Sequence, residues 1–185
     1  DFEQYGRYPF DALPREYDKA VEKFGRNVVH EQGLLPWRVA EFTGRLERAF
    51  ASLSRPSPSP YALDDIVLFS AVLCHYVSDG HVPLHAVKNY DGQLTDQPGA
   101  HSRFEADLFE RYATELKVTP AARASVADPR EETFRILLDS YRLVDPMLAA
   151  DRAAAVGRTH YDDAFFQAFK VEAFPVVDRR IADSI

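Results

Sequence analysis

Five side chains that commonly bind metal ions lie within residues 75–105: His75, Asp79, His85, His101 and Glu105. His75 and Asp79 are four residues apart, as are His101 and Glu105, and residues at this spacing project from one face of a helix. His85 lies on the connection between the two pairs and adds a third imidazole. Imidazole and carboxylate ligands without cysteine are typical of hydrolytic zinc sites, so this stretch predicts a zinc site that does chemistry.

Each of these residues taken alone has a simpler explanation. A histidine on an apolar helix usually packs in the core or at its rim, and a His–Glu pair four residues apart is common on exposed helices. The combination favours a metal, because Asp79 follows an otherwise apolar helix and a metal would provide its counter-charge. His85, His101 and Glu105 together provide three ligands and leave a fourth position for water or substrate.

The remaining histidines and the single cysteine are interpreted as structural. His81 lies between the ligands and is expected either behind them or on the surface, and His30 and His160 are expected to be structural or exposed. Cys74 is expected to be buried and inert, and as the only cysteine it excludes an intrachain disulfide. Three phenylalanines near the end of the chain fit core packing better than base stacking: Phe165, Phe166 and Phe169.

The elements that must position these ligands are helices throughout. Helical spacing and end signals predict helices over residues 14–24, from 36 or 37 to 53, 62–78, 100–116, 130–143, 145–157 and 161–185. The apolar middle of the third helix, residues 66–74, predicts that it is buried, and Asp79–Gly80 predicts its end. Residues 55–60 form a proline-rich connector and residues 86–99 a loop. Because strand alternation is lacking, we expect an all-α fold with residues 1–185 in one domain.

Composition narrows the class of partner. The chain has 185 residues, a formal net charge of −7 and a pI near 5.4. This acidity argues against binding duplex nucleic acid through a broad basic face. The longest apolar run, residues 66–77, is too short to span a bilayer.

The pattern His75-Tyr76-x-x-Asp79-x-x-x-Pro83-x-His85, followed by His101-Ser102-x-x-Glu105, resembles the bacterial zinc-dependent phospholipase C family. It is also similar to the related single-strand-specific zinc nucleases of fungi and plants, which share that fold. The nucleases typically carry Asp where this chain has Glu105, so the pattern favours the phospholipases. The resemblance covers residues 75–105 of the 185.

The resemblance implies an all-helical hydrolase with three zinc ions in a cleft, in which a metal-bound hydroxide attacks the phosphorus of a phosphoester. His75 and Asp79 would serve a paired zinc, with Asp79 bridging to its neighbour. His85, His101 and Glu105 would hold the remaining zinc together with water. The implied substrate is a small phosphoester or a phospholipid, with transient contact at a membrane surface, and the implied location is secreted or periplasmic.

Other metal ligands of that family have no counterpart before residue 75: an N-terminal Trp, a His soon after it, a further Asp and a His in a His-aromatic-x-Asp run. We therefore expect this chain to be the C-terminal part of a longer protein, with Asp1 closing that last run. The general base of the family is among the missing residues, so no catalytic residue beyond the ligands is assigned. Two alternatives stay open: a nuclease or nucleotidase on the same fold, and a non-catalytic helical domain with a remnant metal site. The number of metals, the substrate and the oligomeric state are also open.

Overall fold

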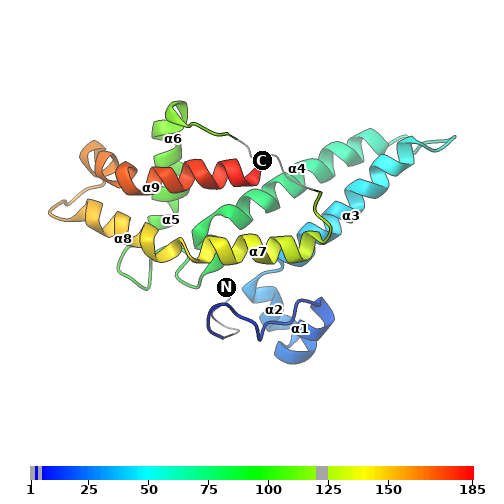
Figure 1. Ribbon diagram of the computed structural model, residues 1–185, viewed down its shortest axis with the longest axis horizontal. Helices are drawn as coiled ribbons and strands as arrows, with labels where there is room; N and C mark the ends of the chain where they lie inside the picture. Colours follow the sequence, from blue (N-terminus) through cyan, green and yellow to red (C-terminus); the bar gives the residue numbers. More distant parts are fainter. Residues whose placement is uncertain (1–2, 4–5, 120–124) are drawn as a thin grey trace. The chain divides into compact units, whose positions relative to one another are not determined.

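The computed structural model describes residues 3, 6–119 and 125–185, and the part of the chain that it describes is helical without β-strands (Figure 1). The predicted all-α class is therefore confirmed. The α-helices are α1 (Tyr17–Phe24), α2 (Arg26–Gln32), α3 (Leu35–Leu53), α4 (Ala62–His81), α5 (Ala100–Ser102), α6 (Leu108–Tyr112), α7 (Pro129–Tyr141), α8 (Val144–Ala155) and α9 (Asp163–Ser184). Shorter turns are the 3₁₀ helices η2 (Pro83–Ala86) and η4 (Ala113–Glu115) and the π-helical turn η3 (Arg103–Asp107). None of the helices described combines the length and apolar character needed to cross a membrane.

Contacts within the chain group into two compact units. One unit contains residues 81–123 and 137–185, and the other contains residues 2–80 and 124–136. The expected single domain over residues 1–185 stays a prediction, and each unit is described by itself.

The unit that contains residues 81–123 and 137–185 is built around aromatic side chains of α9. Phe165, Phe166 and Phe169 are each at most 2% exposed, as predicted for core residues. They pack in one apolar cluster with α8, with the segment from α5 to α6 and with Leu84 of η2. The Asp162 carboxylate accepts a hydrogen bond from the Phe165 main-chain N–H and so caps the start of α9. This core fixes the segments that carry His85, His101 and Glu105.

In the other unit, α3 and α4 contact each other through aromatic rings. The Phe42 ring on α3 meets Phe69 and Tyr76 of α4 edge to face, with centroids 5.9 and 5.6 Å apart. The helix α1 ends at Gly25, whose φ of +85° suits glycine, as predicted. The short helix α2, between Gly25 and Gly33, was not predicted.

Two expectations for the helix over residues 62–78 are wrong. The helix α4 continues through Asp79 and Gly80 to His81, because Gly80 is buried beside Ile136 and Leu35 and this tertiary packing outweighs the weak helix propensity of glycine. The helix is also not buried all round, since its exposed face includes Leu63, Val67, Leu68 and the supposedly buried Cys74. Apolar residues all round a helix do not require cover on every side, and one face of α4 has no cover from the described residues.

The segment expected to be one helix over residues 100–116 is helical but irregular. It begins as α5, widens into the π-helical turn η3, returns to α-geometry in α6 and ends in η4. The later helices match the expected ranges to within two residues at every end, with α7 over residues 129–141, α8 over 144–155 and α9 over 163–184.

Candidate metal centre

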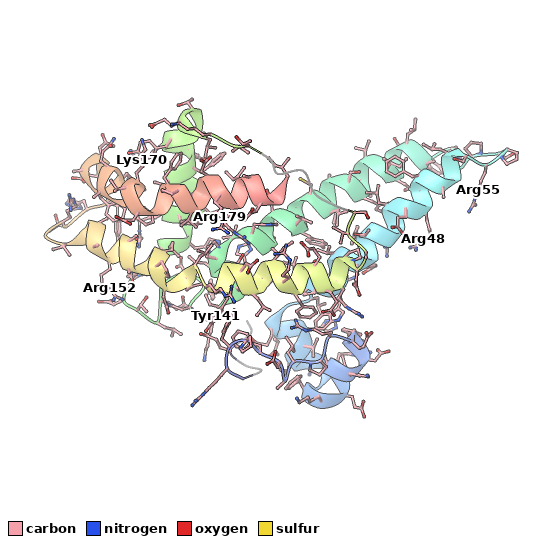
Figure 2. The ribbon with its side chains drawn as sticks, in the orientation of Figure 1. Arg48, Arg55, Tyr141, Arg152, Lys170 and Arg179 are labelled. Carbon is pink, nitrogen blue, oxygen red and sulfur yellow. The ribbon has the colours of Figure 1, made fainter. Side chains whose placement is uncertain are left out.

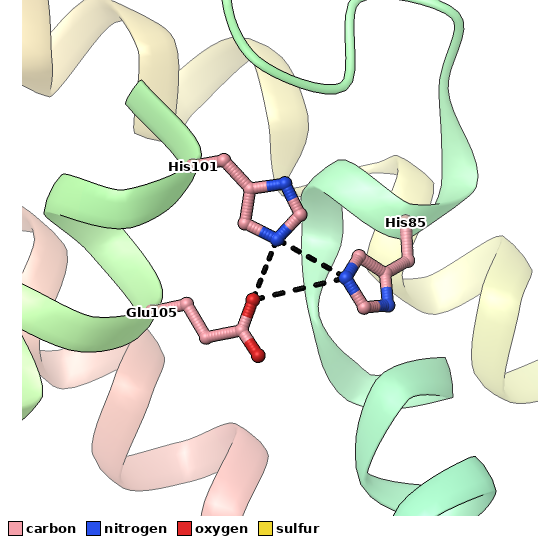
Figure 3. A group of neighbouring side chains, drawn as sticks. All are labelled: His85, His101 and Glu105. Atoms are coloured by element: carbon pink, nitrogen blue, oxygen red, sulfur yellow. Dashed lines mark hydrogen bonds and ion pairs between the residues drawn. The ribbon is translucent and has the colours of Figure 1, made fainter. Parts of the chain in front are cut away.

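His85, His101 and Glu105 converge on one point (Figure 3). The Nε2 atoms of His85 and His101 are 3.1 Å apart, and Oε2 of Glu105 lies 2.5 Å from Nε2 of His101 and 3.7 Å from Nε2 of His85. The three side chains are 26%, 25% and 43% exposed, so the cluster lies at the surface with its donor atoms turned toward one another. These atoms form a hydrogen-bonded His–His–Glu cluster.

The three donor atoms fit a single metal ion. Their separations form a triangle whose corners are all about 1.9 Å from one central point, close to the zinc–ligand distances of about 2.0–2.2 Å. The three side chains could therefore hold one zinc ion together, and a fourth position would be left for water or substrate. In the part of the chain that the structure describes, this is the only group of three or more such side chains within reach of one ion.

His85 is held by a short turn whose other residues are buried. In η2, the side chains of Pro83, Leu84 and Ala86 are buried, and the His85 main-chain N–H donates to the Val82 carbonyl at 3.1 Å. Pro83 suits the first position of the turn because its φ is already restricted. Since its neighbours are anchored in the core, His85 is left as the residue of the turn that faces outward.

The helix turn that carries Glu105 is π-helical. Arg103 and Phe104, at its start, are both 4% exposed, so the turn is fixed to the core from inside. Single π-helical turns within α-helices occur frequently at functional sites. Here the turn begins two residues after His101 and contains Glu105, so the predicted four-residue pair does meet, in a different helical geometry from the one expected.

Loop residues orient His101 from behind. The Tyr90 main-chain carbonyl accepts a hydrogen bond from the His101 ring, and the Asp91 carboxylate accepts from the main-chain N–H groups of Gly99 at 3.0 Å and His101 at 3.4 Å. Because Nε2 faces the cluster, Nδ1 is the ring nitrogen left for the carbonyl. Histidines that bind metals usually donate their second ring N–H in this way, which leaves the facing nitrogen free to bind.

The pKa of His101 is raised above its ordinary value. The main cause is the hydrogen bond to Glu105, which outweighs the opposing effect of partial burial. A negative carboxylate beside the ring favours positive charge at this point, whether that charge is a proton or a metal ion.

A buried ion pair supports this helix turn. Nε of Arg103 donates to Oδ1 of Asp151 at 2.7 Å and Nη2 donates to Oδ2 at 2.9 Å, with the two side chains 5% and 1% exposed. The Gln97 side chain also donates to Asp151 at 2.8 Å, and the Arg103 guanidinium lies 3.9 Å from the centre of the Tyr161 ring. The pair therefore ties the loop and η3 to α8, immediately beside two of the three proposed ligands.

Sequence reasoning missed this pair, although one signal was available. Asp151 lies on a helix face with Met147, Leu148 and Ala154, all of which are buried. A buried carboxylate in such a position requires a positively charged partner. Arg103, which lies between His101 and Glu105 in the sequence, is that partner.

His75 and Asp79 do not belong to the three-residue group. They lie in the unit with residues 2–80 and face each other, with Nε2 and Oδ2 3.4 Å apart and side chains 69% and 25% exposed. Their predicted contact along one helix face is present, but their role as metal ligands stays a prediction.

The other histidines differ in their surroundings. His81 is 4% exposed, so the interpretation of it as a surface residue is wrong, and its main-chain carbonyl accepts a hydrogen bond from Nε of Arg180 at 3.0 Å. His30 and His160 are exposed, as one of the two interpretations expected, and the His30 ring is 3.0 Å from the Tyr17 hydroxyl.

No protein-family model, curated protein or solved structure matches this chain. The resemblance to zinc-dependent phospholipases C therefore rests on residues 75–105 alone. Function must be argued from the chemistry of the cluster itself.

Proposed function

We propose that this chain is a zinc-dependent phosphoester hydrolase of the phospholipase C type, with its metal held by His85, His101 and Glu105. The observation that supports this most directly is the convergence of two imidazole nitrogens and one carboxylate oxygen within 2.5–3.7 Å of one another. Two imidazole ligands favour zinc over magnesium and calcium, which prefer oxygen. Three protein ligands without cysteine are typical of catalytic zinc, which keeps a position open.

Each residue has a definite task in this proposal. His85 and His101 bind through Nε2 in their neutral form, and Glu105 offsets part of the charge of the ion. The Tyr90 carbonyl holds the proton of His101 on the opposite side of the ring. A zinc ion in this position would act as a Lewis acid and would lower the pKa of a bound water toward neutrality. Because Glu105 is 43% exposed, the cluster is open to solvent, and a phosphoester would approach it from that side.

His75 and Asp79 are proposed, from the resemblance alone, to be part of a second metal position. The pair provides two ligands, and two ligands hold zinc more weakly than three or four. We therefore expect one tightly bound zinc per chain, with any further ion bound less tightly.

A second candidate function is supported by the connectivity of the ligands. An ion held by His85, His101 and Glu105 would join η2 to the α5–η3 segment across the loop of residues 86–99. Such a bridge would stabilise the fold, because any ligand that binds only the folded chain raises its stability. In that case the site would be structural, and the chain would bind zinc without turning over a phosphoester.

Zinc binding to the metal-free chain tests the site itself. Calorimetric titration is expected to show one tight zinc site. His85→Ala or His101→Ala is expected to weaken zinc binding by more than about 10–100-fold, which is the typical effect of losing a residue that only hydrogen-bonds to a ligand. His160→Ala, at an exposed histidine outside the cluster, is the matched control and should bind zinc like the unmodified chain. Equal zinc affinity in all of these variants would refute the assignment.

Turnover then separates the candidate functions. The zinc-loaded chain is offered bis(p-nitrophenyl) phosphate, a choline phospholipid in mixed micelles and single-stranded DNA, with His85→Ala as the reference. Zinc- and His85-dependent cleavage of the phospholipid supports the proposal, whereas cleavage of DNA alone would assign the site to a nuclease. A zinc-dependent rise in melting temperature without turnover of any substrate would favour the structural site.

A further inference from the structure

A pocket of about 350 Å³ lies among α1, α2 and α3, in the unit with residues 2–80. Its lining combines aromatic rings, cationic side chains and one carboxylate: Tyr17, Arg26, His30, Leu34, Trp37, Arg38 and Glu41. The volume is at the lower end of the range for small-molecule sites, about 300–1,000 Å³. None of these residues belongs to the proposed metal centre.

The aromatic wall of the pocket is held in place from behind. The Trp37 indole N–H donates to the Arg15 carbonyl at 2.9 Å, and its ring meets Tyr17 and Phe134 edge to face, each with centroids 5.7 Å apart. The Tyr17 hydroxyl is in turn 3.0 Å from the His30 ring. A ring fixed on several sides offers a preformed surface for stacking, which lowers the entropy lost on binding.

The charge of the pocket is positive, although the chain as a whole carries −7. Glu41 accepts hydrogen bonds from Arg38 and from Arg45, which lies outside the pocket, and these bonds lower the pKa of its carboxyl. Arg38 keeps further N–H groups, since a guanidinium has five. Arg26, by contrast, forms no ion pair or side-chain hydrogen bond with residues 3, 6–119 or 125–185.

We propose that this pocket binds a small aromatic anion, a planar ring that carries a phosphonate, phosphate or carboxylate group. The ring would lie against Trp37, and the anionic group would meet Arg26 and the free N–H groups of Arg38. Arg26 and Arg38 line the same pocket, and Arg26 has no partner among the described residues, so its guanidinium can donate two parallel N–H groups to two oxygens of such an anion. This inference does not depend on the proposed zinc site.

The single tryptophan makes the test specific to this pocket. Trp37 is the only Trp in the sequence, so its fluorescence reports directly on the pocket wall. Phenylphosphonate is the probe because it has no ester bond that a phosphoester hydrolase could cleave. We expect a saturable change in Trp37 emission with phenylphosphonate and at least about tenfold weaker binding of methylphosphonate, which lacks the ring, and of benzyl alcohol, which lacks the charge.

Two arginine variants test which cation matters. Arg26→Ala is expected to weaken phenylphosphonate binding at least about tenfold, because the charged hydrogen bonds to the anion are lost. Arg55→Ala is the matched control and should bind unchanged. Arg55 lies beyond the C-terminal end of α3 (Figure 2), whereas the α3 residues that line the pocket lie near the start of that helix. Both residues are exposed, so both variants are expected to fold, which far-ultraviolet circular dichroism will check.

The outcomes separate this inference from the zinc proposal. Binding of phenylphosphonate to His85→Ala with unchanged affinity supports a distinct site, whereas loss of binding in that variant would assign the anion to the metal centre. A linear, unsaturable change in emission, an equal response to benzyl alcohol or unchanged binding by Arg26→Ala would each overturn the proposal.

Discussion

The buried pair of Arg103 and Asp151 yields the most demanding prediction. In Asp151→Ala, the guanidinium of Arg103 would remain 4% exposed but would lose both hydrogen bonds to the carboxylate. It would keep its bonds to the main-chain carbonyls of Pro98 at 2.9 Å and Gln97 at 3.3 Å, which carry no full charge. The substitution therefore leaves a buried cation without its counter-ion.

The expected loss of stability is large. Hydrogen bonds to charged groups contribute about 1.5–3 kcal/mol each, and two are lost, while removal of Asp151 also relieves the cost of burying it. Breaking a buried pair from one side typically costs about 3–5 kcal/mol, a large part of the about 5–15 kcal/mol by which a folded chain is stable. With an m-value of about 2 kcal/mol per molar urea, the midpoint should fall by about 2 M.

Urea unfolding followed by circular dichroism at 222 nm measures this loss. Asp163→Ala is the control, because Asp163 pairs with Arg111 at 2.6 Å but is 91% exposed, and it should cost at most about 1 kcal/mol. The double variant Arg103→Ala/Asp151→Ala should lose less free energy of unfolding than the sum of the losses in the two single variants, because neither charge is then left without its counter-ion. A cost below about 1 kcal/mol for Asp151→Ala, or simple additivity in the double variant, would refute the reasoning.

Two further predictions concern the same unit. In metal-free protein, His101 should titrate above its ordinary pKa because of Glu105, so this pair stabilises the fold fully below about pH 6.5 and progressively less as the pH rises through the folded pKa. NMR titration of the ring protons measures that pKa, which should drop in Glu105→Gln, and an unchanged value would contradict the assignment. At Gly92, φ is +75° and an added Cβ would lie 2.3 Å from the Gln97 carbonyl oxygen, so Gly92→Ala should cost at least about 2 kcal/mol. Gly157→Ala, at φ +72° with open space around it, should cost about 1 kcal/mol, and equal losses in urea unfolding would show that the contact with Gln97 is not responsible.

Most helices were predictable because their signals are local. Gly25 ends α1, Pro36 lies in the first turn of α3, and apolar side chains recur at helical spacing between such signals. The helix α2 was missed because it has seven residues between two glycines, too few for a period to become visible. The π-helical turn η3 was missed for a different reason: its hydrogen bonds shift by one residue, and this leaves no mark in the spacing of apolar residues.

Part of the candidate metal centre was also predictable. The spacing of His101 and Glu105 is a local property, and their side chains meet at 2.5 Å. His85 can join them only if the intervening loop folds so that His85 lies next to His101, which is sixteen residues away in the sequence. Residue spacing alone cannot establish that. The resemblance supplied that expectation, and the buried neighbours of His85 in η2 provide the physical basis for it.

By itself, the sequence determined the helical class, most helix boundaries and the identity of the candidate metal ligands, because these depend on residue types and, for the helices, on neighbours within one or two turns. Tertiary structure alone decided which surfaces are covered. Thus Arg103 and Asp151 form a buried pair, Gly80 packs inside α4 instead of ending it, and Cys74 is exposed. Burial depends on which distant segments pack together, and the same residue is stable in a helix whether or not another segment covers it.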